Sequence, residues 1–294
     1  MKRNTSNTIN SMTRRKLITL LGTTGVLGLP GFSKRSSDFF TAGNKQIHLN
    51  NNEKTMSSSN TKMKTIGILG GVGPQATMNF EEHIHLASQR LIPPLLNSGY
   101  PPVIVFYHRY APVQINKDMT PVFPLRPDQG LLDAAKILGT MVDFLVIPSN
   151  GVHMMQNEIE QAAGRKIVSI IDATLEEVKN RKWKRVGVVG YKNALVYTSR
   201  LKDMGIEFET ISSQLQEKLD VSIMKVMEGR DDADDRALVM EIINDLRSRN
   251  VDGIIPGCTE LPLLLGENMN APDLVNPAKL LAEAAVKYSL SYLE

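Results

Sequence analysis

The chain of 294 residues has only one cysteine, Cys258. A single cysteine cannot form a disulfide within the chain, so its thiol is either an inert buried side chain or a reactive group. When nothing else is known of a protein, the inert side chain is the more common of the two. The position of Cys258 relative to other motifs therefore has to decide between them.

The sequence also lacks an apolar run suited to a membrane span. Residues 17–29 are apolar but diluted by Gly and Thr, whereas a spanning helix needs ~20 strongly apolar residues, so we expect no stable membrane span. Arg14 and Arg15 precede this run, and paired arginines before a short, weakly apolar stretch resemble a twin-arginine export signal. We expect export, with the periplasm as destination. The alternative is a random basic tail on a cytoplasmic protein.

A basic excess is absent from most of the chain. Residues 1–63 hold 10 of the 34 Lys and Arg but only 2 of the 31 Asp and Glu, so the remaining 24 basic and 29 acidic residues give a formal charge of −5. The overall charge of +3 is therefore due to the N-terminal segment. An acidic body argues against nucleic acid as the main partner.

Two apolar segments of the first half are repeated in the second half. Residues 64–71 and 184–191 each begin with basic residues, continue as an apolar strand with an internal glycine and end in a glycine turn. Residues 142–150 align without gaps on residues 251–259. Continuously apolar segments are typical of parallel strands covered on both faces. The repeat therefore predicts two similar domains.

Helical stretches between these strands complete a β-α-β alternation, which predicts an α/β fold with an open parallel sheet in each domain. The stretches span residues 129–142, 172–181, 235–249 and 277–290. We expect the last of them to fold back onto the first domain. The predicted boundaries are 1–63 for the export signal and a disordered linker, 64–165 plus 274–294 for the first domain, and 166–273 for the second.

The aligned repeat places Ser149 opposite Cys258, each at the carboxyl end of a predicted strand. Ligands of open α/β sheets bind beyond these strand ends. If the two domains are related by a pseudo-twofold axis, the two side chains face one cleft from opposite sides. That arrangement suits the movement of a proton between the two faces of a carbon atom.

Three motifs together resemble the aspartate/glutamate racemase family. They are the motif Gly257-Cys258-Thr259-Glu260, residues 65–71 with Ala76 and Thr77, and residues 149–153. The family shares its fold with maleate isomerases, hydantoin racemases and arylmalonate decarboxylases. The resemblance implies that Cys258 exchanges a proton with the substrate α-carbon and that no cofactor takes part.

The chain also departs from the family pattern. Ser149 stands where the family has its first catalytic cysteine, and Gly151 replaces a threonine. Asn276 stands where an aspartate is common. An arginine expected near residues 114–117 and a threonine pair expected near residues 190–194 are not evident. These departures leave the substrate open, and a serine in the first position suggests specialisation for one enantiomer.

Cys258 precedes a predicted helix or turn, where free backbone N–H groups favour a thiolate over the ordinary thiol with its pKa of about 8.5. We therefore expect a lowered pKa. Ser149 is a far weaker acid and needs assistance to move a proton. Its hydroxyl has a second interpretation, as the cap of a helix that begins near Asn150.

Several neighbouring residues are candidates for substrate binding. Asn150, Gly151 and Thr259 could hold a carboxylate by side-chain and backbone donors. His153 follows Ser149 by four residues, so on a helix it could relay a proton, although a satisfied core histidine fits equally well. These residues extend the predicted site beyond the two proton-transfer groups.

Gly71, Gly73 and Gln75 form a glycine turn after the first strand, which we interpret as close approach of the backbone to the substrate. The turn matches a dinucleotide fingerprint only formally, because no acidic residue ends the next predicted strand. We predict neither a metal nor a cofactor.

Taken together, these features predict an isomerase, an amino-acid racemase that acts on a small acidic substrate. A cofactor-free decarboxylase or isomerase of a small dicarboxylate is one alternative. An exported binding protein with weakened catalysis is another, because two α/β domains around a cleft also describe solute receptors. We leave a homodimer open as the oligomeric state.

Overall fold

The structure is a computed structural model that describes residues 63–93, 99–118 and 120–291. These described residues belong to one compact unit. Residues 1–62, which contain the predicted export signal and almost all of the predicted linker, lie outside the described residues. None of the described helices has the length and apolar character needed to cross a bilayer.

The first sheet contains four parallel strands in the order β2-β1-β3-β4. Their bounds are Ile66–Gly70 for β1, Val103–Tyr107 for β2, Phe144–Val146 for β3 and Ile167–Val168 for β4. Ile66 of β1 lies opposite Val103 on one side and Phe144 on the other. All five residues of β1 are buried. The predicted buried parallel strand within residues 64–71 is therefore confirmed.

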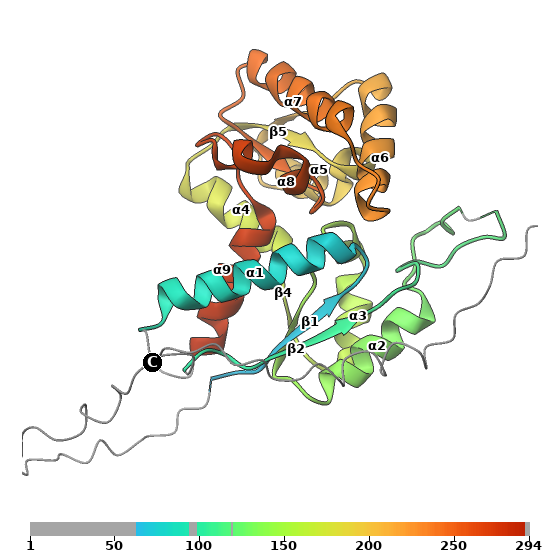
Figure 1. Cartoon of the computed structure of the whole chain (residues 1–294), viewed down its shortest axis with the longest axis vertical. Coiled ribbons are helices and arrows are strands. Elements are labelled where there is room, and N and C mark those ends of the chain that lie inside the picture. The colour runs from blue at the N-terminus through green and yellow to red at the C-terminus, as the bar shows by residue number, and fades with distance from the viewer. Residues whose placement is uncertain (1–62, 94–98, 119, 292–294) are drawn as a thin grey trace, which may run out of the picture. The chain divides into compact units, whose positions relative to one another are not determined.

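Successive residues of a strand point to opposite faces of its sheet. The buried side chains of the first sheet therefore lie on both faces, and helices cover both. Ile66 and Ile68 pack into a cluster with α1 and α9, whereas Leu69 packs with α2 and α3. The bounds are Pro74–Leu91 for α1, Gln129–Gly139 for α2, Gln156–Ala163 for α3 and Pro277–Leu290 for α9. Figure 1 shows α1 beside α9 next to β1 and β2.

The second sheet, in the order β6-β5-β7, is again parallel. The bounds are Arg185–Val189 for β5, Glu207–Glu209 for β6 and Gly253–Pro256 for β7. This order repeats β2-β1-β3, so the two sequence repeats occupy equivalent places in their sheets. The α/β fold with parallel sheets is confirmed. The pseudo-twofold relation and the domain boundaries stay predictions, and strand pairing assigns β4 to the first sheet.

The second sheet is also covered on both faces. Val186 and Val188 pack with α4 and α5, whereas Val189 and Ile254 pack with α6, α7 and α8. The helix bounds are Ile170–Asn180 for α4, Leu195–Asp203 for α5, Ser213–Met227 for α6, Ala233–Ser248 for α7 and Leu261–Leu265 for α8. Three 3₁₀ helices complete the described elements: η2 (Gly151–Met155), η3 (Tyr191–Ala194) and η4 (Gly266–Asn270).

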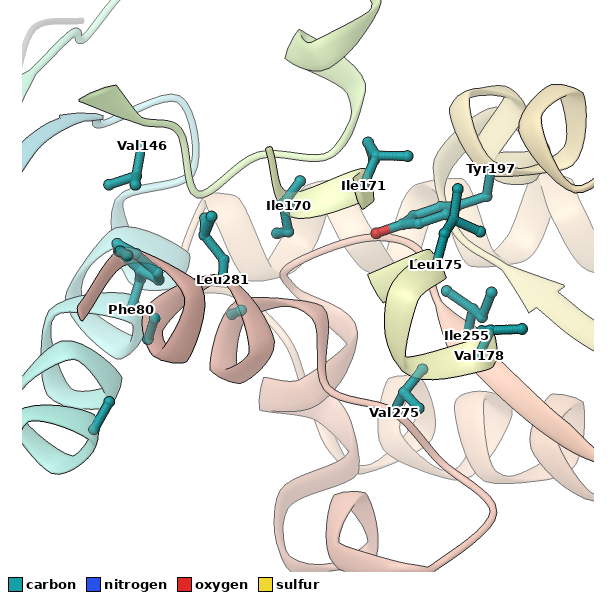
Figure 2. Packing of buried hydrophobic residues seen from close by; sticks show 14 of the residues in the cluster. Phe80, Val146, Ile170, Ile171, Leu175, Val178, Tyr197, Ile255, Val275 and Leu281 are labelled. Atoms are coloured by element: carbon teal, nitrogen blue, oxygen red, sulfur yellow. The ribbon is translucent and has the colours of Figure 1, made fainter. Parts of the chain in front are cut away.

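The last helix, α9, connects the end of the chain to the start of the first sheet. Asn276 Oδ1 caps it by accepting a hydrogen bond from the Lys279 backbone N–H at 3.2 Å. At its other end, the Ser289 hydroxyl donates to the Lys64 carbonyl at 2.6 Å, and the Lys64 N–H donates to the Ser289 carbonyl. Figure 2 shows Leu281 beside Phe80 in a buried cluster that also contains Ile255 and Tyr197.

Leu281→Ala should lower the free energy of unfolding by about 2 to 5 kcal/mol, because it leaves a cavity in this cluster. Leu281 is 0% exposed, whereas Leu86 on α1 is 53% exposed, so Leu86→Ala is the matched control and should change stability by no more than about 0.5 kcal/mol. Urea unfolding of both variants measures the difference. Equal effects would contradict the packing described for α9.

Candidate active site

Two hydrogen bonds hold the segment that follows β3. The Thr259 hydroxyl, which follows β7, donates to the Pro148 carbonyl at 3.3 Å. The Tyr197 hydroxyl of α5 donates to Asn150 Oδ1 at 2.7 Å, and the Tyr197 side chain is fully buried. The first bond brings the residue before Ser149 and the residue after Cys258 together, and the convergence of both side chains on one cleft stays a prediction.

Cys258 is paired with a buried carboxyl group two residues later. Its Sγ donates a hydrogen bond to Glu260 Oε2 at 2.9 Å. Glu260 is only 5% exposed, and a Cβ atom on Gly73 would overlap Glu260 Oε1. The carboxyl group thus lies between the thiol and the glycine turn that follows β1. A side chain at position 73 would therefore displace the Glu260 carboxyl group.

The pKa of the Cys258 thiol is raised well above its ordinary value, in contrast to the lowered pKa that the sequence predicted. Burial is the largest cause, and the charge of Glu260 and the hydrogen bond to it act in the same direction. The backbone N–H groups of Glu260 and Tyr191 lower the pKa as expected, but they are outweighed. The prediction of a lowered pKa was wrong because it included neither the desolvation of the thiol, which is the largest effect, nor the adjacent buried carboxylate.

The pKa of Glu260 is raised as well, and burial is the cause. Hydrogen bonds from Cys258, from its own backbone N–H and from Thr259 oppose that rise without cancelling it. A carboxyl group with a raised pKa can hold a proton closer to neutral pH than an exposed one. Cys258 and Glu260 can therefore share protons as a coupled pair.

Asn150 offers an unused donor at this site. Its side chain is 3% exposed, and its Nδ2 is buried without a hydrogen-bond partner among the described residues. Leaving an amide group in that state costs about 1 to 3 kcal/mol. A ligand carboxylate would supply the missing acceptor, in agreement with the predicted role of Asn150.

Comparison with known proteins identifies the family of this chain. The model of the family Asp/Glu/Hydantoin racemase matches residues 69–285. The chain belongs to this family. Across 231 residues it is 26% identical to the broad specificity amino-acid racemase RacX of Bacillus subtilis (strain 168), over 77% of this chain and 99% of that protein.

Solved structures of racemases share the fold. An aspartate racemase homologue from Pyrococcus horikoshii OT3 is 22% identical, with a TM-score of 0.60, over 77% of this chain and 99% of that chain. Picrophilus torridus aspartate racemase is 20% identical, with a TM-score of 0.61, over 78% of this chain and 98% of that chain. At these identities the similarity establishes the fold and leaves the substrate open.

Ser149 occupies the position where the family pattern predicts a cysteine, and its hydroxyl has no partner among the described residues. It does not cap a helix, because η2 has Asn150 as its N-cap and no side-chain capping bond. The helix-cap interpretation is therefore not supported. No side chain among the described residues forms a hydrogen bond with this hydroxyl.

His153 is held by backbone groups at both ring nitrogens. Nδ1 lies 2.8 Å from the Ser149 carbonyl, and Nε2 accepts from the Ile170 N–H at 3.3 Å. Burial lowers the pKa of His153 to about 4, so the ring is neutral with the proton on Nδ1. These contacts favour the core histidine over the proton relay, and they fix the backbone of Ser149.

The glycine turn after β1 packs against the end of the neighbouring strand. Gly71 has φ +88°, and a Cβ atom there would lie 2.7 Å from the His108 backbone. This contact by itself requires glycine at position 71, and the approach of the turn to a substrate stays a prediction. The Thr77 hydroxyl accepts from the Gly71 N–H and donates to the Gly73 carbonyl, which closes the turn. Only Gly73 of the two glycines reaches the Cys258–Glu260 pair.

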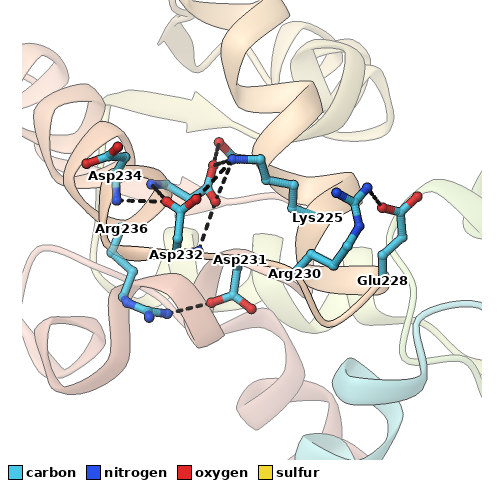
Figure 3. Close-up of polar contacts among 9 residues, drawn as sticks. Lys225, Glu228, Arg230, Asp231, Asp232, Asp234 and Arg236 are labelled. Atoms are coloured by element: carbon cyan, nitrogen blue, oxygen red, sulfur yellow. Dashed lines mark hydrogen bonds and ion pairs between the residues drawn. The ribbon is translucent and has the colours of Figure 1, made fainter.

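Gln75 begins the first helix beneath the α6–α7 turn, where its Nε2 lies 3.8 Å from the Cβ position of Gly229. Its Oε1 is buried without a partner in the described part of the chain. On the other side of this turn Asp232 caps α7, and Lys225 binds Asp232 and Asp235 (Figure 3). The acidic residues at the start of α7 therefore form a helix cap.

Gly151, the remaining candidate, is exposed and has nothing within 4 Å of its Cβ position. Two residues were missed. Glu260 belongs to the motif that identified Cys258, and its position two residues after the thiol was an available signal. Tyr197 carried no signal, because its contact with Asn150 joins residues 47 positions apart.

Glu260→Gln should lower the pKa of Cys258, because it removes a negative charge and a carboxylate acceptor from the thiol. Each unit of decrease raises the thiolate fraction about tenfold at neutral pH, so alkylation by iodoacetamide at pH 7 should accelerate. Glu267→Gln, at an exposed position, is the control and should match the wild type. An unchanged or slower rate in Glu260→Gln would contradict the described electrostatics.

Proposed function

We propose that the protein is a cofactor-independent amino-acid racemase that exchanges the α-proton of a small acidic amino acid through Cys258. The observation that carries this proposal is the half-buried Cys258 thiol bonded to the buried Glu260, in a segment that Thr259 joins to Pro148, two residues before the unpartnered amide of Asn150. The proposed site thereby has a base, a group that accepts the proton of that base, and a hydrogen-bond donor for the substrate carboxylate. The chemistry uses protein groups alone.

The first step begins with transfer of the thiol proton from Cys258 to Glu260, which leaves a thiolate. The thiolate takes the α-proton, and the electron pair of the C–H bond moves into the substrate carboxylate to give an enediolate-like anion. Cys258 is again a thiol, and Glu260 holds the transferred proton because burial raises its pKa. Once the carbon has been protonated on its opposite face, Glu260 releases this proton to solvent, which balances the proton taken from water on that face. A base placed in this way contributes about 10²- to 10⁴-fold to the rate.

The anion is stabilised by donors aimed at the substrate carboxylate, which is where negative charge develops. Asn150 Nδ2 is the donor that the described residues leave unpaired. Its orientation is set by the Tyr197 hydroxyl, which holds Oδ1 at 2.7 Å. Tyr197 is thus proposed as a positioning residue for Asn150.

Ser149 is proposed to act on the opposite face. Its hydroxyl protonates the carbon and recovers its proton from water, or it orders a water molecule that does so. Since an alcohol is far less acidic than a thiol, proton transfer on this face should be slower. The proposed enzyme therefore exchanges the α-proton faster from one enantiomer, the one whose α-proton faces Cys258.

The substrate is proposed to be an amino acid, in agreement with the family and with the amino-acid racemase activity for which the Bacillus subtilis relative is named. An assay panel should include acidic and neutral amino acids, because that relative is described as having broad specificity. Loss of CO₂ or isomerisation of a dicarboxylate would identify the cofactor-free alternative. Binding without turnover would identify the binding protein.

Export stays a separate proposal that rests on Arg14 and Arg15. Replacing both by lysine should retain the full-length protein in the cytoplasm, as measured by cell fractionation. The unmodified protein supplies the periplasmic reference. An unchanged distribution would remove the twin-arginine assignment and leave the racemase proposal intact.

Cys258→Ala should abolish racemisation while the protein stays folded. If Cys258 were only a packing residue, its loss would cost roughly 1 to 2 kcal/mol of stability, and activity would fall only with the folded fraction. The measurement is chiral analysis of single enantiomers together with thermal unfolding. Activity retained by the folded variant would disprove the role of Cys258.

A further inference from the structure

The segment after β5 has an unusual backbone. Lys192, Asn193 and Ala194 have φ values of 50°, 61° and 43°, in the left-handed region. None of the three is glycine, and residues with a Cβ atom rarely adopt this conformation in succession. Such strain persists only where the surrounding structure holds it. Residues 190–194, called here the β5 loop, therefore need an external support.

Two side chains of α6 provide that support. Asp220 Oδ1 accepts from the Lys192 backbone N–H at 3.1 Å, and Oδ2 lies 3.4 Å from Lys192 Nζ. Gln216, one turn earlier, donates to the Gly190 carbonyl at 2.9 Å and to Asp220 Oδ1 at 2.6 Å. The two side chains thus hold the backbone on both sides of Tyr191.

The inner side of the β5 loop packs against the residue that precedes Cys258. A Cβ atom on Gly190 would lie 2.8 Å from the Gly257 carbonyl carbon, and one on Gly257 would lie 2.7 Å from the Ala194 Cβ. The Tyr191 backbone N–H lies close enough to the Cys258 thiol to lower its pKa. Displacement of the loop would therefore change both the position and the solvent exposure of Cys258 Sγ.

The outer side of the loop borders a surface hollow of about 310 Å³. Tyr191 and Asp220 line it together with Val221, Met224 and Arg230. Tyr191 thus belongs both to this hollow and, through its backbone, to the surroundings of the thiol. A loop that moved toward the hollow would uncover Cys258.

We propose that Asp220, together with Gln216, is a positioning residue that holds the β5 loop over Cys258 and thereby sets the placement and solvation of the thiol. The consequence for catalysis rests on the proposed function. The consequence for the reactivity of the thiol does not, because alkylation can be measured without a substrate.

The test compares Asp220→Ala, Asp220→Asn and the wild type in the full chain. In Asp220→Ala, kcat should fall about 10- to 100-fold, as expected for a misplaced reacting group, with KM nearly unchanged. Iodoacetamide should alkylate Cys258 faster at pH 7, and the inflection of the rate against pH should move to lower pH, since burial is the largest cause of the raised pKa. Asp220→Asn keeps an oxygen that can accept from the Lys192 N–H, so its kcat and its alkylation rate should stay close to those of the wild type.

Glu217→Ala, which removes an exposed carboxylate from the same helix, is the matched control. Its alkylation profile should equal that of the wild type, and thermal unfolding should show all variants folded at the assay temperature. An unchanged profile in Asp220→Ala, or equal changes in the Ala and Asn variants, would overturn the proposal. If the wild type shows no turnover, the proposed function fails, and the alkylation profiles alone decide this inference.

Discussion

The candidate site depends on the burial of one carboxyl group, that of Glu260. Its two oxygens lie against Gly73 on one side and the Cys258 thiol on the other. Burial raises the pKa of both acidic groups, because each charged form loses water without gaining a cation. At neutral pH the pair therefore holds its protons more tightly than either group would at the surface. The proposed reaction requires a proton to pass from Cys258 to Glu260, and the hydrogen bond of 2.9 Å between them gives that proton a direct path.

The same burial explains features that are distant in sequence. A side chain at position 73, which follows the first strand of the first sheet, would displace the carboxyl group of Glu260, which follows the last strand of the second. Thr259 joins the end of β7 to the end of β3 through Pro148, and Tyr197 joins α5 to the same segment through Asn150. The repeated strand order places these ends in equivalent positions of their sheets. Repetition of the β-α-β unit thus supplies two strand ends, and a few polar contacts combine them into one site.

Much of the fold and part of the site could be predicted from the sequence. β1, β5 and α9 were predicted because continuous apolar strands and a Pro-started helix are local patterns. Cys258 was found because the internal repeat and a motif agree on its position. The raised thiol pKa, the backbone partners of His153 and the contact of Gly71 with His108 could not be predicted. Each depends on groups that folding brings together from separate segments.

The left-handed β5 loop illustrates the same limit. Lys192, Asn193 and Ala194 have no local preference that would predict three such residues in succession, and the conformation depends on Asp220 and Gln216 of a later helix. Composition and periodicity identify elements, whereas strain and its compensation are properties of tertiary contacts.

The most direct test of the central claim is exchange of the substrate α-proton with deuterated solvent, followed separately for each enantiomer of an amino acid that the protein accepts. A thiol on one face and an unassisted hydroxyl on the other predict much faster exchange from one enantiomer, and loss of that fast exchange in Cys258→Ala. Equal exchange from both enantiomers, or fast exchange that survives without Cys258, would contradict the account.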